Sequence, residues 1–469
     1  MALPLTGSST ALISGATAAG AGQDYGIAGF SSKTFQATVS GAGAVAATVR
    51  VEVSNDEVNW TPAGTISLSG TTIATDGFVS DASWKFVRGN VLSISGTGAA
   101  VALNVLVIAE DGTSAITVLA NVQNLIPSLV FNKYRKALAK TRDGVSDTRV
   151  LLSGDSTFTG IGSTLSGTFP AVGSVCNRLA TLLNTAATPA ILSLGLPPSI
   201  LSGNPDNRWV AGSGWTGATF GAAAGAAWVA AGTTGNLVYT PNPQVTCDGF
   251  YVYWIGSSGY GTLTATATGG TPQVINANVA TSMYRTLIPA ASAVATNTLT
   301  MSSVGQVFIT AVEPVLSTKK QILVGNAGVG SSSTINWNSS GTYQGLGFIS
   351  TVAPDLTIIS LGINDAFSSI APATYAANIQ AMITAAQVSG DVLLMPPLPN
   401  GNAACRAYEV QYLPVLQNLA AVNNCAYLDI FNRWGGAYNA NFMYSDQTHG
   451  TNTGYWDWAQ FVANVIGNP

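Results

Sequence analysis

The one histidine of the 469-residue chain lies in the sequence Asp-Gln-Thr-His at 446–449, close to the C-terminus. A second polar segment, Gly-Asp-Ser at 154–156, follows an apolar run and predicts a serine hydroxyl at the carboxyl end of a buried strand. An imidazole can take the proton of a serine hydroxyl, and a carboxylate can hold the imidazole in the tautomer that this step requires. Ser156, His449 and Asp446 would then serve as nucleophile, base and orienting carboxylate in acyl transfer.

Four segments resemble, in the same order, the sequence blocks of the SGNH (GDSL-type) hydrolase family. They are Gly-Asp-Ser ending at Ser156, Asn-Ala-Gly-Val-Gly at 326–330, Gly-Ile-Asn-Asp at 362–365 and Asp-x-x-His at 446–449. The resemblance covers residues 145–205 and 318–469. It implies a serine esterase with Ser156 as nucleophile, His449 as base and Asp446 as the carboxylate.

The resemblance also implies an oxyanion hole. Its donors would be the backbone N–H of Ser156, the side-chain amide of Asn364 and a backbone N–H of the second block. The family usually has glycine directly after the second block, where this chain has Ser331. Because the donor is a main-chain group, a serine can supply it, and both Gly330 and Ser331 stay open as its source.

Other reactive side chains have simpler interpretations. Asp155 and Asp365 are expected to accept hydrogen bonds at their turns, and Asp429 is the alternative to Asp446 as the carboxylate. Metal-ligand spacing is missing among the four cysteines, so the sequence predicts neither a metal site nor a cofactor. These cysteines are Cys176, Cys247, Cys405 and Cys425, and a Cys405–Cys425 bridge stays open.

The composition excludes several classes of protein. Charged residues make up 8% of the chain, the net charge is −4 and the isoelectric point is near 4.9, which argues against a nucleic-acid partner. Mean hydropathy is +0.32, yet the chain lacks an apolar run of about 18 residues, so we expect no membrane span. The first residues carry no basic segment, and we expect no secretory signal.

Apolar runs alternate with helical patterns in the part that carries the four blocks. This alternation is typical of a parallel sheet covered on both faces, and the resemblance implies the flavodoxin-like three-layer α/β/α fold. The predicted strands are 149–152, 321–324, 356–361, 391–395 and 426–431, and the predicted helices are 172–184, 373–388, 407–422 and 454–466.

The first two blocks are too far apart for one helix and one loop to connect them, which indicates an insertion. Residues 206–317 contain short strand-like runs and predict an inserted β-sandwich, similar to the jelly-roll of carbohydrate-binding modules. Trp209, Trp215 and Trp228 could stack on sugar rings there. For each of them, a place in the core or at a domain junction is the favoured alternative.

Residues 1–112 are predicted to form an N-terminal β-rich domain for virion attachment or assembly. Small side chains dominate the first 30 residues and predict an extended or assembly-dependent segment, whereas 33–110 indicate a small β-sandwich. Residues 52–60 resemble segments of bacteriophage structural proteins, and the alternative is a generic β domain with Trp60 in its core. A linker and a basic helix, 113–145, follow, and Pro127 is expected to begin the helix. We interpret its charges as a solvated helix face, and binding of an anionic glycan is the alternative.

The site therefore predicts a serine esterase. The resemblances and the two β modules imply that it removes O-acetyl groups from a bacterial surface polysaccharide, a capsule or an O-antigen. The resemblances imply a homotrimeric bacteriophage tail fibre or tailspike protein that is bound to other virion tail proteins and acts at the host cell surface. The alternative is a receptor-binding tail protein built on an inactive hydrolase scaffold.

Overall fold

The chain consists of two compact units, Met1–Val122 and Gln123–Pro469. The computed structural model describes residues 8–27, 30–80, 84–109, 130–163, 170–196, 208–219, 226–338 and 345–467. In this part of the chain, no helix combines the length and apolar character needed to cross a membrane.

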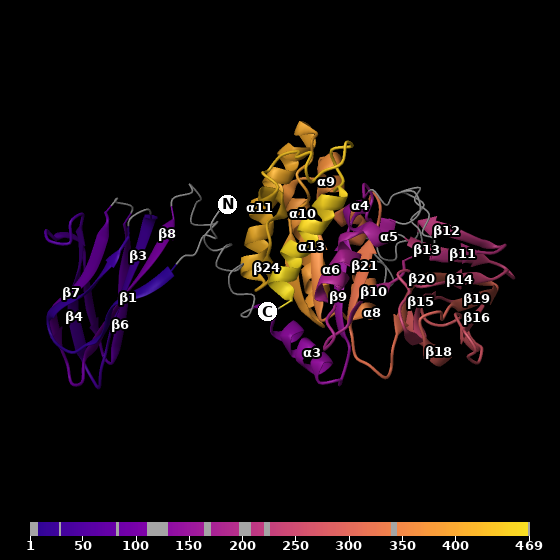
Figure 1. Cartoon of the computed structure of the whole chain (residues 1–469), viewed down its shortest axis with the longest axis horizontal. Coiled ribbons are helices and arrows are strands. Elements are labelled where there is room, and N and C mark those ends of the chain that lie inside the picture. Colours follow the sequence, from indigo (N-terminus) through magenta and orange to yellow (C-terminus); the bar gives the residue numbers. More distant parts are fainter. Residues whose placement is uncertain are drawn as a thin grey trace. The chain divides into compact units, whose positions relative to one another are not determined.

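The first unit contains two four-stranded antiparallel sheets, in the orders β1-β8-β3-β6 and β2-β7-β4-β5 (Figure 1). Alternate side chains of both sheets enter one hydrophobic core, in which Val39, Val49 and Val105 are fully buried. The strands are Ser8–Ala16 (β1), Gly20–Gly26 (β2), Phe30–Ser40 (β3), Val45–Ser54 (β4), Thr61–Gly70 (β5), Ile73–Ser80 (β6), Phe86–Ser95 (β7) and Ala100–Ala109 (β8).

Two expectations for the first unit were wrong. Residues 8–27 are not a separate extended segment, because β1 pairs with β8, and Leu12 and Ile13 are buried in the core. Few large side chains are enough when a strand adds to the edge of a sheet. Trp60 does not belong to the core: its ring lies 4.2 Å beneath the guanidinium of Arg88, near the surface.

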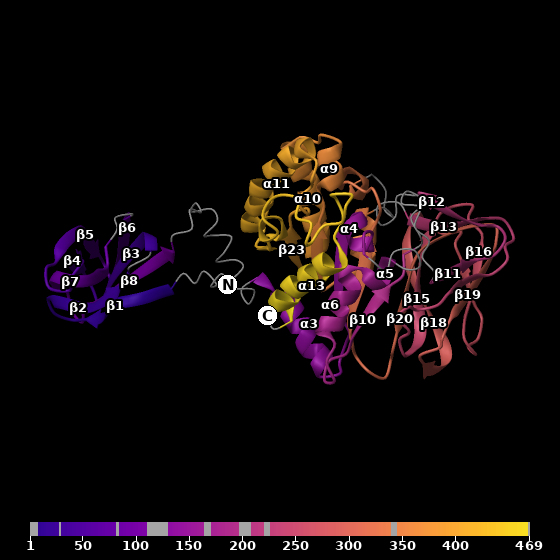
Figure 2. The same cartoon turned by 45° about the horizontal axis from the view of Figure 1, so that its top comes forward.

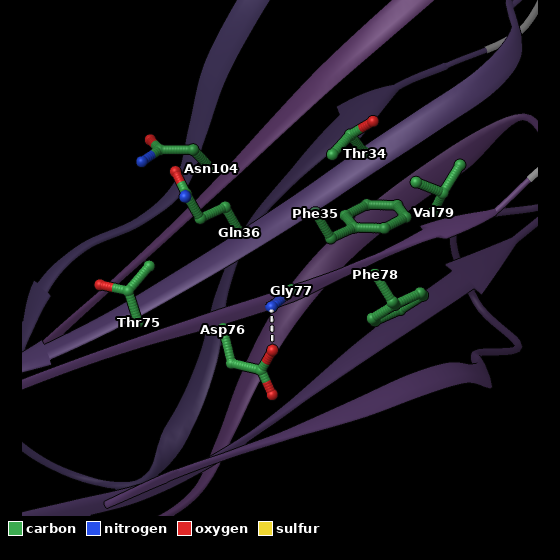
Figure 3. A pocket seen from close by; sticks show the side chains of 9 residues that line it. All are labelled: Thr34, Phe35, Gln36, Thr75, Asp76, Gly77, Phe78, Val79 and Asn104. Atoms are coloured by element: carbon green, nitrogen blue, oxygen red, sulfur yellow. Dashed lines mark hydrogen bonds between the residues drawn. The ribbon is translucent and has the colours of Figure 1, made fainter. Parts of the chain in front are cut away.

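A hollow of about 560 Å³ lies over β3 and β6 in the first unit (Figure 3). Gln36 is paired with Asn104 on one side and with Gly77 on the other. Asp76 is the one carboxylate in the lining, and its Oδ1 accepts the Gly77 N–H at 2.8 Å. The lining contains no base to pair with it, so the hollow holds no acid–base pair.

A six-stranded parallel sheet, β10-β21-β9-β22-β23-β24, forms the centre of the second unit (Figures 1 and 2). The strand of this sheet that comes first in the sequence, β9, lies between β21 and β22, with Gly154 level with Gly328 and Ser360. The carboxyl ends of these three strands therefore meet at one place. The strands are Thr148–Gly154 (β9), Ala190–Leu194 (β10), Ile322–Gly328 (β21), Leu356–Ser360 (β22), Asp391–Met395 (β23) and Ala426–Tyr427 (β24).

Helices cover both faces of this sheet. Val150 and Leu152 share a core with α3, α6 and α13, and Leu151 points to the opposite face, where α10 and α11 contact β23. The helices are Asn132–Arg142 (α3), Ser156–Thr159 (α4), Pro170–Gly173 (α5), Val175–Leu183 (α6), Thr334–Trp337 (α7), Gly345–Val352 (α8), Ile363–Phe367 (α9), Pro372–Gln387 (α10), Ala403–Val422 (α11), Ile430–Arg433 (α12) and Asn452–Ile466 (α13).

The final predicted strand, 426–431, was wrong in its second half. It ends at Tyr427, and α12 begins at Ile430, because the side chain of Asp429 accepts the backbone N–H of Asn432 and caps the helix. The basic side chains of α3 are exposed, whereas Tyr134 and Leu138 are buried, which agrees with a solvated helix face. Pro127, the expected start of this helix, lies outside the described residues.

Ten antiparallel strands lie between β10 and β21 in the sequence. They form two five-stranded sheets, β11-β14-β19-β16-β17 and β12-β13-β20-β15-β18, around one core. A bridge between Gly195 and Val312 joins this insert to the end of β10. The strands are Trp209–Ala211 (β11), Trp215–Thr219 (β12), Ala226–Ala231 (β13), Leu237–Tyr239 (β14), Cys247–Gly256 (β15), Thr262–Ala267 (β16), Gln273–Asn276 (β17), Ser282–Val294 (β18), Leu299–Val304 (β19) and Gln306–Val315 (β20).

The three tryptophans considered as sugar platforms belong to the core of the insert. Trp209 and Trp215 are each 6% exposed and Trp228 is 9% exposed. The indole N–H of Trp209 donates to the carbonyl of Leu196, and that of Trp215 donates to the carbonyl of Gly235. The sugar-stacking interpretation was therefore wrong for these residues, because their faces pack against other side chains.

Candidate active site

Ser156 begins α4 directly after β9, so its hydroxyl lies where the carboxyl ends of three strands meet. Asp155 caps this short helix: its Oδ1 accepts the Thr157 N–H at 2.9 Å and the Thr157 hydroxyl at 2.8 Å. Burial raises the pKa of Asp155 to about 6, although the hydrogen bonds from Thr157 act in the opposite direction. Asp155 thus fixes the turn that presents Ser156.

His449 joins Ser156 to Asp446. Its Nε2 lies 2.7 Å from Ser156 Oγ, and its Nδ1 lies 2.7 Å from Asp446 Oδ2. The histidine side chain is 16% exposed, so the imidazole is shielded but can still be reached from solvent. The structure brings these three residues, 293 positions apart at the extremes, into one hydrogen-bonded chain.

The Asp446 carboxylate also organises the turn that carries the histidine. Its Oδ1 accepts the backbone N–H groups of Thr448 at 2.9 Å and of His449 at 3.0 Å. Burial alone would raise the pKa of Asp446, but the hydrogen bonds from the His449 side chain and from both backbone groups hold it at about 2. Asp446 is therefore ionised near neutral pH.

A second loop, which contains Asn400 and Gly401, is hydrogen-bonded to the histidine turn. The Gly401 N–H donates to the Gln447 carbonyl at 2.9 Å, and the Asn400 amide donates to the Thr448 hydroxyl at 3.2 Å. Glu409 holds this loop, because its Oε2 accepts the Asn400 N–H at 2.9 Å. Glu409 is fully buried, and burial raises its pKa to about 7. Sequence reasoning missed Glu409, since a glutamate within a helix gives no signal of such a contact.

The loop after α4 lies against the histidine from another side. Gly162 adopts a φ of 88°, and a Cβ atom there would lie 2.8 Å from the Cβ of His449. The Tyr455 hydroxyl donates to the Ile161 carbonyl at 2.5 Å and ties the loop to α13. A side chain at position 162 would displace His449, so this close approach requires glycine.

The second block lies beside Gly154, next to the nucleophile. The Val329 N–H donates to the Gly154 carbonyl, and the Ser332 N–H donates to the Val329 carbonyl. In the sequence, Gly330 and Ser331 lie between Val329 and Ser332, whose N–H groups are both hydrogen-bonded. Ser331 has a φ of 59°, in the left-handed region that favours glycine, which gives a physical reason for the glycine expected there.

Asn364 lies on α9 and faces the second block. One of its amide N–H groups donates to the Ser332 carbonyl at 2.9 Å, which orients the amide and leaves its other N–H for a ligand. The neighbouring Asp365 is fully buried and accepts the Thr334 N–H at 3.0 Å, which joins α9 to α7. The residues predicted as oxyanion donors therefore come from the ends of the adjacent strands β9, β21 and β22.

Two of the alternatives left open by the sequence do not fit the structure. Asp429 caps α12 and takes no part in the contact with His449, which Asp446 makes. All four cysteines are free and buried, so Cys405 and Cys425 are not bridged. Among the residues that the structure describes, no group of three or more His, Cys, Asp or Glu side chains could hold a metal ion.

The model of the GDSL-like lipase/acylhydrolase family matches residues 306–456, which include Asn364, Asp446 and His449. The second unit contains a GDSL/SGNH hydrolase domain. Ser156 and Asn364 follow the carboxyl ends of its strands β9 and β22, and the domain is of the esterase and acylhydrolase type.

Several solved structures are similar to this chain at low sequence identity. A peptidoglycan O-acetylesterase is 16% identical with a TM-score of 0.58, and the match covers 73% of this chain and 96% of that one. A G-D-S-L family lipolytic protein from Desulfitobacterium hafniense is 20% identical (TM-score 0.27; 31% and 81% covered). An acetylxylan esterase from Geobacillus stearothermophilus is 18% identical (TM-score 0.26; 30% and 71% covered). No curated protein matches the sequence.

Proposed function

We propose that the GDSL/SGNH hydrolase domain cleaves acetyl esters with Ser156 as nucleophile, His449 as base and Asp446 as the orienting carboxylate. The observation that carries the proposal is the hydrogen-bonded chain of these three side chains, with both contacts at 2.7 Å. This is the arrangement that activates a serine hydroxyl, which is a poor nucleophile without an adjacent base.

In the first half of the reaction, Ser156 Oγ attacks the ester carbonyl while His449 Nε2 takes its proton. The negative charge on the carbonyl oxygen is received by the backbone N–H of Ser156, the free amide N–H of Asn364, and the N–H of Gly330 or Ser331. One such donor contributes about 3–4 kcal/mol to the transition state in comparable sites. The alcohol then leaves with the proton from His449, and the acetyl group stays on Ser156.

In the second half, water attacks the acetyl-serine and gives its proton to His449. The tetrahedral intermediate collapses, acetate leaves, and Ser156 Oγ recovers its proton from the imidazole. Asp446 stays ionised throughout, because its pKa is held at about 2, and its charge stabilises the protonated imidazole in both halves.

The proposed substrate is an O-acetylated bacterial surface polysaccharide, a capsule or an O-antigen. The fold shared with a peptidoglycan O-acetylesterase supports a carbohydrate ester. The two antiparallel sheets of the insert are consistent with the proposed carbohydrate-binding module. Because Trp209, Trp215 and Trp228 are buried, any sugar contact in the insert has to use other side chains.

We further propose a place on a bacteriophage tail, as a homotrimer joined to other virion tail proteins and acting at the host cell surface. The support is the resemblance of residues 52–60 to phage structural proteins, and the first unit would provide the attachment. Sedimentation equilibrium of the purified chain tests the trimer, and a monomer would contradict it.

Turnover of p-nitrophenyl acetate by the intact chain and by Ser156→Ala tests the chemistry. We expect hydrolysis that Ser156→Ala abolishes. Absence of turnover in the wild-type protein would instead favour the receptor-binding alternative with an inactive scaffold. Acetate release from a panel of O-acetylated capsules, O-antigens and peptidoglycans then identifies the polymer.

A further inference from the structure

Phe367 follows Asn364 by three positions in α9, and the two residues lie on the same surface of this helix. Residues three apart in a helix are neighbours, and the Ser368 N–H donates to the Asn364 carbonyl at 3.0 Å, which confirms a helical turn between them. The Phe367 side chain is 52% exposed. An aromatic ring is therefore presented to solvent beside the amide proposed as an oxyanion donor.

Tyr444 lies beside His449 in the turn that carries the imidazole. Met443 forms an antiparallel bridge with Gly450, and the Tyr444 N–H donates to the His449 carbonyl at 2.8 Å. Opposed residues in such a pair point to the same side, and successive residues alternate. Tyr444 thus shares its side with the imidazole and is 46% exposed, whereas Met443 points inward and is 1% exposed.

The exposed residues next to these two rings in the sequence are polar: Ser368 and Ser369 follow Phe367, and Ser445, Asp446 and Gln447 follow Tyr444. A fatty acyl chain needs a continuous apolar wall to leave water. A pyranose ring has one face of C–H groups and a rim of hydroxyls, which suits single aromatic rings among hydroxyl and amide side chains.

We propose that Phe367 and Tyr444 form a sugar-binding subsite on the two sides of Ser156. The rings hold the carbohydrate on the alcohol side of the ester, so that the acetyl carbonyl lies between Ser156 and the oxyanion donors. The pair would select acetylated sugars over acetate esters of simple alcohols and over esters of long fatty acids. The inference rests on the proposed esterase function and adds the residues that choose its substrate.

The test compares kcat/KM for glucose pentaacetate, ethyl acetate and ethyl octanoate. We expect the ratio of glucose pentaacetate to ethyl acetate to fall about tenfold in Phe367→Ala and in Tyr444→Ala, and further in the double variant, because a stacked ring contributes about that much. Phe367→Tyr and Tyr444→Phe keep the rings and should keep the ratio. Val410→Ala removes a side chain that is 50% exposed on α11 and is the matched control.

An unchanged ratio in both alanine variants would overturn the subsite, and so would a loss confined to ethyl octanoate, which would indicate an acyl-chain role. Binding of an acetylated xylo-oligosaccharide, measured by calorimetry in the Ser156→Ala background, separates this inference from the proposed catalysis. Weaker binding after Phe367→Ala or Tyr444→Ala would support the subsite even if the wild-type chain hydrolysed none of the esters. Equal binding would refute it.

Discussion

The two carboxylate oxygens of Asp446 accept hydrogen bonds from the His449 imidazole and from two backbone N–H groups. The same side chain therefore shapes the turn and orients the base. These two tasks can be separated by a substitution, because an asparagine oxygen can still accept the backbone N–H groups but carries no charge.

Asp446→Asn should leave the fold intact and lower kcat for p-nitrophenyl acetate by several decades, up to about 10⁴-fold. The amide favours the wrong imidazole tautomer and does not stabilise the protonated ring. Since the pKa of Asp446 is about 2, its ionisation cannot produce an acid limb in the pH–rate profile between pH 4 and 9. Steady-state kinetics over this range, with circular dichroism as the folding control, provide the check. A loss below tenfold would contradict the assigned role.

Glu409 is a buried acid whose pKa is raised from 4.5 to about 7. Between these values the folded state binds more protons than the unfolded state, so this group lowers stability as the pH rises from about 4.5 to about 7. Glu409→Gln removes the ionisation and keeps an oxygen for the Asn400 N–H. We expect a higher melting temperature than wild type at pH 8, by several degrees, and a smaller difference at pH 5. An equal difference at both pH values would contradict the burial of a titrating carboxyl.

At the scale of elements, the α7–α9 junction connects the two parts of the proposed oxyanion hole that do not come from Ser156. Thr334 at the start of α7 donates its backbone N–H and its hydroxyl to Asp365 on α9, and the Asn378 amide donates to that hydroxyl at 2.9 Å. The loop 329–333 is therefore held in register with Asn364 through buried hydrogen bonds.

Thr334→Val keeps the shape of this side chain but removes the hydroxyl. A buried carboxylate then loses a donor, which should destabilise the fold by about 1–3 kcal/mol. We expect kcat for p-nitrophenyl acetate to fall, because the donors shift relative to Ser156, while Thr334→Ser should retain both stability and rate. Urea unfolding and steady-state kinetics of the two variants measure the difference. A full rate in a destabilised Thr334→Val protein would separate the junction from catalysis.

The sequence was most informative for the elements that carry the site. Apolar runs followed by polar turns indicated β9, β21 and β22, and their parallel pairing explains why Ser156, the second block and Asn364 meet. The strands β1 and β2 could not be recognised, because their runs of small residues form strands only when β8 and β7 offer a neighbouring edge. The length of β24 depended on the cap formed by Asp429, which competes with sheet pairing.

Contacts between residues that are distant in the sequence could not be predicted from it. Glu409 supports the histidine turn through Asn400, whose N–H donates to Glu409 and whose amide donates to Thr448. The spacing of these residues in the sequence does not indicate that contact. Tryptophan is the residue type expected at a sugar-stacking site, but the strand register places the side chains of these three tryptophans in the core of the insert. Burial, which distinguishes Trp209 from Tyr444, depends on which elements pack over a residue.

At the scale of the whole molecule, the first unit has a hydrophobic core of its own and contributes no residue to the hydrogen-bonded chain at Ser156. A protein that begins at Gln123 should therefore fold and hydrolyse p-nitrophenyl acetate at close to the full rate. Acetate release from the natural polymer should fall if the first unit organises the trimer. A folded truncation without esterase activity would contradict the independence of the second unit.

The place of the insert determines when activity can arise during synthesis on the ribosome. Ala190 of β10 pairs with Ile322 of β21, so the sheet cannot close until the intervening insert has been translated. The strand of the nucleophile also pairs with β21, and the histidine follows only near the end of the chain. Sheet pairing between such distant segments is slow, and the N-terminal part emerges first. A nascent chain would therefore contain a folded first unit well before the proposed active site could form, and early termination of translation would leave the first unit without that site.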